Sequence, residues 1–92
     1  MDAKTFKVKI DIDKKELEKM TGVEEVRTEI LDDLSAKIAI RLDTPTSIDD
    51  FLWFVGDEYT IKSTEVNANH RNNEVWLIFY NISPKTNGCK TD

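Results

Sequence analysis

The feature that most constrains the fold of this chain is an unbroken run of apolar residues near its C-terminal end, from Val75 to Tyr80. Successive side chains of a β-strand point to opposite faces of a sheet, so a strand of this composition needs cover on both faces. The run therefore predicts a central strand at residues 74–83, with a helix over one of its faces and Pro84 at its end.

Two further segments carry strand patterns. Residues 59–67 alternate loosely between apolar and polar side chains, and we expect them to form a hairpin with the central strand through the asparagine-rich segment 69–73. Residues 4–12 alternate regularly, with charged residues between the apolar ones, which predicts a half-buried strand whose lysines lie on an exposed face or edge. The apolar members of this alternation are Phe6, Val8, Ile10 and Ile12.

Two helices are predicted between these strand segments. Asp13 can cap a short helix at residues 14–20, before Thr21 and Gly22 interrupt the pattern. A longer helix is predicted at residues 23–42, because its apolar residues fall on one stripe at a helical repeat. That stripe consists of Val23, Val26, Ile30, Leu31, Leu34 and Ile38.

The second half of the longer helix has an alternative. Ala36, Ile38, Ile40 and Leu42 also alternate with their neighbours as they would in a strand, so residues 36–43 can instead form a fourth strand. The lack of a turn signal before this segment favours the helix, and the strand stays open as the alternative.

A third helix is predicted at residues 47–55. Pro45 pushes the residue before it out of the helical region, and Ser47 begins a Ser-Ile-Asp-Asp sequence that resembles a capping box. Gly56 is a typical residue for the end of such a helix.

These elements predict an α+β fold: a two-layer domain in which a small, mostly antiparallel sheet is packed by helices. A single domain at residues 1–84 is expected, because the chain has 92 residues and shows neither an internal repeat nor an interdomain linker. Residues 85–92 are polar and are expected to form a flexible tail.

The charge of the chain bears on its partners. Its 13 basic and 18 acidic residues give a net charge of −5, which disfavours direct contact with nucleic acid or an anionic membrane and favours a partner protein with a basic surface. No window approaches the length of a membrane span, and the N-terminal residues lack the apolar core of a secretion signal. Together with the single cysteine, Cys89, these features predict a cytoplasmic protein of a bacterial or an infected host cell.

No catalytic residue, cofactor site or metal site is predicted. The chain lacks the G-x-x-x-x-G-K, G-x-G-x-x-G, H-E-x-x-H and C-x-x-C motifs, and its one histidine, His70, lies in the predicted hairpin loop without a nucleophile motif nearby. Adjacent carboxylates occur at residues 32–33, 49–50 and 57–58, but neighbours on a helix point in different directions. We therefore expect a protein without enzymatic activity and without a cofactor.

The best candidate for a binding surface is the segment from Asp43 to Glu58. It holds five acidic residues and no lysine or arginine, together with three aromatic rings. Large rings fill pockets at interfaces, and the charges around them select the partner. The alternative is that the rings pack on the sheet while the acids only cap and solvate the helix. The candidate residues are Asp43, Asp49, Asp50, Phe51, Trp53, Phe54, Asp57 and Glu58.

A second candidate surface is the outer face of the helix predicted at residues 23–42. This face would carry Glu25, Glu29 and Asp32, and such a row of carboxylates could imitate the phosphates of DNA for a DNA-binding protein. The alternative is an ordinary solvated helix face.

The sequence thus favours a small acidic protein-binding module that acts as a regulator or inhibitor of a basic nucleic-acid-handling protein. The alternative is an assembly subunit of a homo-oligomer or a virion, in which the strand at residues 4–12 extends the sheet of a neighbouring copy. The position of Trp53 matters most for the first hypothesis, since a ring sealed in the core cannot anchor a partner.

Overall fold

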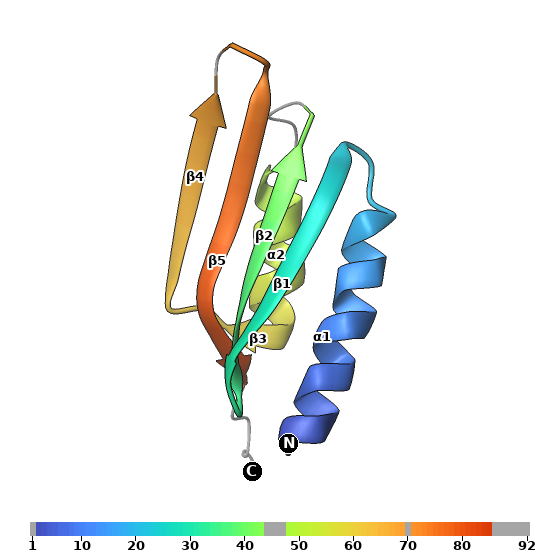
Figure 1. The fold of residues 1–92 in the computed structure, drawn as a ribbon, viewed down its shortest axis with the longest axis vertical. Coiled ribbons are helices and arrows are strands. Elements are labelled where there is room, and N and C mark those ends of the chain that lie inside the picture. The colour runs from blue at the N-terminus through green and yellow to red at the C-terminus, as the bar shows by residue number, and fades with distance from the viewer. Residues whose placement is uncertain (1, 44–47, 70, 86–92) are drawn as a thin grey trace.

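In the computed structural model, which describes residues 2–43, 48–69 and 71–85, two helices pack against a five-stranded antiparallel sheet (Figure 1). The predicted α+β fold class is therefore confirmed. The elements are α1 (Ala3–Glu18), β1 (Val23–Asp32), β2 (Ser35–Leu42), α2 (Ile48–Glu58), β3 (Tyr59–Thr60), β4 (Ser63–Asn69) and β5 (Glu74–Pro84). The expectations for Ser47, His70, Cys89 and the polar tail beyond Lys85 concern residues outside the described ranges.

β5 lies at the centre of the sheet, as the run of apolar residues predicts. The strand order is β1-β2-β5, and β3 and β4 share the far side of β5. β4 pairs with the N-terminal part of β5, up to Ser63 opposite Tyr80, and β3 pairs with its C-terminal end. Between these two pairings Asn81 has a positive φ of 51°, and the irregularity divides the strand predicted at residues 59–67 into β3 and β4.

The strand predicted at residues 4–12 is wrong, and so is a separate helix at residues 14–20, because both segments belong to the single helix α1. The alternation that suggested a strand depends on Val8 and Ile12, which stay 51% and 54% exposed on the outer side of the helix. The apolar residues of α1 that are buried recur at a helical spacing, one or two turns apart. They are Phe6, Ile10 and Leu17.

The start of α1 is set by Asp2, whose side chain accepts a hydrogen bond from the backbone N–H of Thr5 at 2.8 Å. Asp13, which was expected to cap a helix, lies inside α1 and is buried. A residue type that is common at caps is thus used here for a contact in the core.

The long helix predicted at residues 23–42 is also wrong, and the alternative strand at residues 36–43 is confirmed. The segment forms a β-hairpin of β1 and β2, whose many β-branched residues favour a pleated strand. Asp32 stabilises the turn between them, because its side chain accepts a hydrogen bond from the backbone N–H of Leu34 at 3.3 Å. Three members of the predicted apolar stripe stay exposed at this end of the hairpin: Ile30, Leu31 and Leu34.

The helix predicted at residues 47–55 is confirmed as α2 over its described part. The helix continues to Glu58, so Gly56 lies within it instead of ending it. Tyr59 follows directly and begins β3, and the chain passes from helix to sheet without a loop.

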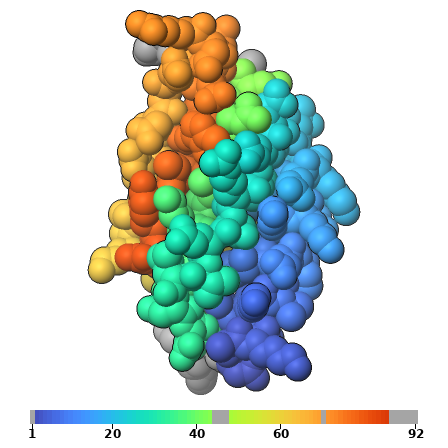
Figure 2. All heavy atoms as spheres, viewed as in Figure 1, coloured from blue at the N-terminus to red at the C-terminus, as the bar shows by residue number. Residues whose placement is uncertain are grey.

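The core lies between the helices and one face of the sheet. Alternate residues of β2 and β5 point into it and form one apolar cluster with the buried residues of both helices. Phe6 of α1 and Tyr59 meet edge to face within it, their ring centroids 6.2 Å apart. In Figure 1 α2 lies behind the strands, and Figure 2 shows the opposite face of the sheet, which we call the open face.

Candidate functional site

The aromatic residues of α2 lie in different surroundings. Phe51 and Val55 are about one helical turn apart and point to the sheet, where they are 2% and 0% exposed. Trp53 lies roughly 200° around the helix axis from Phe51, because an α-helix has 3.6 residues per turn, and it is 75% exposed. Phe54 is half-buried and packs against the core. Of the three rings predicted to bind a partner, Trp53 is the one that the fold leaves in water.

Trp53 borders two shallow hollows. One has a volume of about 360 Å³ and reaches Met20, just beyond α1, and the other has a volume of about 400 Å³ and reaches Lys85, just beyond β5. Trp53 and Asp57 line both, so the indole forms a ridge that is accessible from two sides. The first hollow is lined by Met20, Asp50, Trp53, Phe54, Asp57 and Glu58, and the second by Leu52, Trp53, Gly56, Asp57 and Lys85. We call these residues, together with Asp49, the Trp53 surface.

Carboxylates surround Trp53 on α2, which contains no lysine or arginine. One of them, Glu58, is partly balanced by Lys9 of α1, whose Nζ lies 3.6 Å from Oε2. Asp43 was predicted with this group but lies just after β2, where its backbone N–H donates to the carbonyl of Gly22, and it does not line either hollow. The exposed carboxylates of α2 are Asp49, Asp50, Asp57 and Glu58.

A buried polar cluster fastens α1 to the start of β3, directly after the end of α2. The hydroxyl of Tyr59 donates a hydrogen bond to Oδ2 of Asp13. The Nζ of Lys9 lies 3.4 Å from the same oxygen and 5.2 Å from the centroid of the Tyr59 ring. Burial, and then the bond to Asp13, raise the pKa of Tyr59 well above its usual range, so its hydroxyl remains a neutral donor. Because its polar groups satisfy one another, we assign this cluster a structural role.

The described residues offer few groups that are arranged for catalysis or for metal binding. No three His, Cys, Asp or Glu side chains among them are arranged to hold a metal ion. The described residues that line the two hollows include no serine, cysteine or histidine. Of the two described helices, neither is both long enough and apolar enough to cross a membrane.

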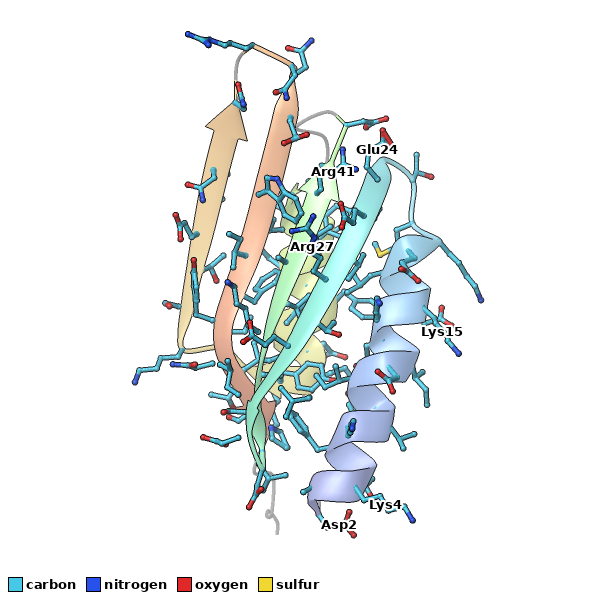
Figure 3. All side chains as sticks on the ribbon, viewed as in Figure 1. Asp2, Lys4, Lys15, Glu24, Arg27 and Arg41 are labelled. Atoms are coloured by element: carbon cyan, nitrogen blue, oxygen red, sulfur yellow. The ribbon has the colours of Figure 1, made fainter. Side chains whose placement is uncertain are left out.

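The acidic helix face predicted from Glu25, Glu29 and Asp32 does not exist, because all three residues lie on β1. Oε2 of Glu25 lies 2.6 Å from Nε of Arg27, and Oε1 lies 3.3 Å from Nε of Arg41. Figure 3 shows these two arginines close together on β1 and β2. The hydrogen bond from Arg27, more than that from Arg41, holds the pKa of Glu25 below its usual value. The helix that was expected to imitate DNA is therefore replaced by a strand whose carboxylate Glu25 is paired.

Sequence reasoning missed the pairing of cations with aromatic rings on the open face. The Cζ of Arg27 lies 5.0 Å from the centroid of the Trp76 ring, and the Nζ of Lys37 lies 5.4 Å from that of Tyr80. The available signal was the strand alternative for residues 36–43, which puts its charged residues on the face opposite to its buried ones. A hollow of about 490 Å³ on this face is lined by Arg27, Thr28, Glu29, Lys37, Ala39, Trp76 and Ile78.

The polar groups of the open face largely satisfy one another. Oε2 of Glu74 lies 3.4 Å from Nη1 of Arg41, and its Oε1 accepts a hydrogen bond from Nε1 of Trp76 at 3.3 Å. The hydroxyl of Tyr80 donates to Oε1 of Glu65 at 2.6 Å. These contacts explain how β5 has cover on both faces: α2 packs over one, and cationic side chains lie over the aromatic rings of the other.

Comparison of the chain with models of known protein families, with curated proteins and with solved structures finds no match.

Proposed function

We propose that the protein is a small, non-enzymatic binding module that uses the Trp53 surface to hold a basic segment of another protein. The observation that carries this proposal is the 75% exposure of Trp53 on a helix where Phe51 is buried and Phe54 is half-buried. Burying a large ring removes much apolar area from water, and tryptophan is among the residues that most often dominate binding energy at interfaces. A partner that covers the ridge and enters the two hollows would recover this energy.

The charges on α2 indicate the chemistry of the partner. The helix carries four carboxylates and no cation, and the whole chain has a net charge of −5. Such a field attracts a basic segment and repels an acidic one. An arginine of the partner can stack on the indole of Trp53 while it pairs with Asp50 or Asp57.

A basic surface is typical of proteins that handle nucleic acids, and we therefore expect the partner to be one of them, with this chain as its regulator or inhibitor. Binding by the Trp53 surface would keep the partner from its nucleic acid by occupying basic groups, without imitation of DNA by a row of carboxylates on a helix. A cytoplasmic location, without direct binding to nucleic acid and without a cofactor, remains part of this proposal.

The first experiment isolates a partner by pull-down with the unchanged chain. It then measures the affinity of this partner for the unchanged chain and for two variants. Trp53→Ala should weaken binding about 30-fold, the expected loss for a central interface tryptophan of roughly 2 kcal/mol. The triple variant Asp49→Lys, Asp50→Lys, Asp57→Lys should also weaken binding, because the surface would then repel a basic partner. Salt should weaken the binding of the unchanged protein by screening attraction, and should strengthen the binding of the variant by screening repulsion.

Matched controls exist on α1. Ile12→Ala removes a second exposed apolar side chain, and the triple variant Asp11→Lys, Glu16→Lys, Glu18→Lys makes the same change of charge away from the Trp53 surface. Both should bind the partner like the unchanged protein. A partner that binds Trp53→Ala and the α2 charge variant with unchanged affinity and unchanged salt dependence would remove the proposal.

A fluorescence titration gives a direct readout of the same surface. The chain has two tryptophans, so Trp76→Phe leaves Trp53 as the single indole. Addition of a peptide with alternating arginine and leucine should shift its emission to shorter wavelength, whereas an acidic peptide of the same length should not. Equal responses to both peptides would show that charge does not select the ligand.

A further inference from the structure

Beside the N-terminal part of β5, the edge of the sheet is not covered by any other element among the described residues. β4 forms this edge, pairs with β5 on one side only, and has all seven residues exposed. In Figure 1 no described element lies beside β4 on the side away from β5. In an edge strand the backbone N–H and C=O groups of alternate residues point outward, where another strand can pair with them.

The opposite edge of the sheet is protected in ways that β4 is not. β1 carries five charged residues among its ten, and α1 packs against it. Charged side chains, prolines and covering helices are the usual means by which proteins prevent edge strands from pairing. β4 contains no proline, lysine or arginine, and Glu65 is its only charged residue.

We propose that β4 pairs antiparallel with β4 of a second copy of the chain, about a two-fold axis at Val66, so that the two sheets become one. Val66 is the middle residue of the strand, and it is 51% exposed although it lies opposite the buried residue Leu77 of β5. In the symmetric pair the two Val66 side chains contact each other and leave water.

The side chains of β4 fit this register. Pairing about Val66 places Thr64 opposite Ala68, and Glu65 opposite Asn67, of the second copy. Glu65 already interacts with Asn67 of its own strand, and an amide has two N–H groups, so Asn67 can donate to a carboxylate of each copy.

Other registers are less favourable. A shift of the axis to Glu65 brings two carboxylates opposite each other, which destabilises a strand pair. A shift to Asn67 separates the two Val66 side chains and leaves the end of the strand unpaired. A pairing that is out of step by one residue places the helices of the second copy on the opposite face of the joined sheet.

The test is the molar mass of the intact chain in solution, measured by sedimentation over a wide range of concentration. The unchanged protein should form a dimer as concentration rises. Val66→Lys, which sets two like charges against each other at the axis, should leave a monomer. Val8→Lys is the control, because Val8 has the same 51% exposure but lies on α1, and it should leave the dimer intact.

A pair of variants at Asn67 tests the register itself. Asn67→Lys faces Glu65 of the second copy and should tighten the dimer by about tenfold, because the contact occurs twice. Asn67→Asp faces the same carboxylate and should weaken the dimer by a similar factor. Circular dichroism should show an unchanged fold in all variants, since residues 66 and 67 are exposed.

A strict monomer at every concentration would overturn the proposal, and so would a dimer that is indifferent to Val66→Lys and to both Asn67 variants. Assemblies larger than a dimer would likewise contradict it, because two-fold pairing of β4 closes the assembly. β4 contributes no residue to the Trp53 surface, so the outcome is independent of the function proposed above.

Discussion

The two helices cover the same face of the sheet but divide their residues differently. α1 buries three large apolar residues to 1% exposure or less, and its five lysines are mixed with four carboxylates. α2 buries Phe51 and Val55, leaves Trp53 75% exposed, and carries charge of one sign. The surface of α1 mixes charges of both signs, whereas α2 combines a core side with the exposed ring and carboxylates on which the proposed function depends. Substitutions on α2 should therefore lower either stability or binding, according to the side of the helix on which the residue lies. Substitutions on α1 should lower stability alone.

The largest expected effect is on the core side of α1. Phe6→Ala should lower the free energy of unfolding by about 3–5 kcal/mol, because it removes a buried ring and leaves a cavity beside Tyr59. Trp53→Ala on α2 should change it by no more than about 0.5 kcal/mol, since that ring is already in water. Urea denaturation of both variants measures the difference. Equal losses for the two would contradict the distinction between the helices.

An intermediate effect is expected where α1 is fastened to the start of β3. Tyr59→Phe removes the donor to Asp13 and leaves the buried carboxylate with Lys9 alone, which should cost about 1–3 kcal/mol of unfolding free energy. Tyr80→Phe is the matched control, because its hydroxyl donates to the exposed Glu65. Denaturation should show a clearly smaller loss for the control. Similar losses for both would mean that the Asp13 contact does not fasten α1 to β3.

The smallest expected effect concerns the start of α1 and depends on pH. The backbone hydrogen bond from Thr5 holds the pKa of Asp2 below its ordinary value of 3.8. Asp2 therefore stabilises the folded chain above pH 3.8, and this contribution is lost as the pH falls through the lowered value. Asp2→Ala should reduce the unfolding midpoint slightly at neutral pH and no longer do so in acid.

Asp2→Asn is the control for this small effect, because asparagine keeps an acceptor for the Thr5 N–H but does not titrate. It should retain most of the stability at neutral pH. On acidification its unfolding midpoint should fall less than that of the unchanged protein. A cost of Asp2→Ala that stays the same in acid would show that the cap does not act through its carboxylate.

Local pattern was enough for the parts of the fold where one interpretation fits. The run within residues 74–83 requires cover on both faces, and β5 accordingly lies at the centre of the sheet. The acidic, aromatic composition of α2 was also visible, although not which of its rings would stay in water. These features depend on the residue types within a single element, so no distant contact was needed to recognise them.

Where two patterns fitted, the sequence favoured the wrong one. Phe6 and Ile10 satisfy a strand alternation and a helical repeat equally well, and the burial of Leu17 but not of Val8 and Ile12 decides for the helix. Residues 36–43 offered the same ambiguity, and it was resolved by the antiparallel pairing of β2 with β1 and β5. The pairing of β2 with β5 joins residues far apart in the chain, and its energy does not appear in any local window.

The sequence by itself determined an α+β domain with a central apolar strand and a helix rich in carboxylates. The tertiary structure alone decided that Phe51 is sealed in the core while Trp53 stands in water, and that Arg27 reaches Trp76 across β2. The physical reason is that exposure depends on which face of an element meets the sheet, and cross-strand contacts depend on register. Both are set by packing between segments that are distant in the chain.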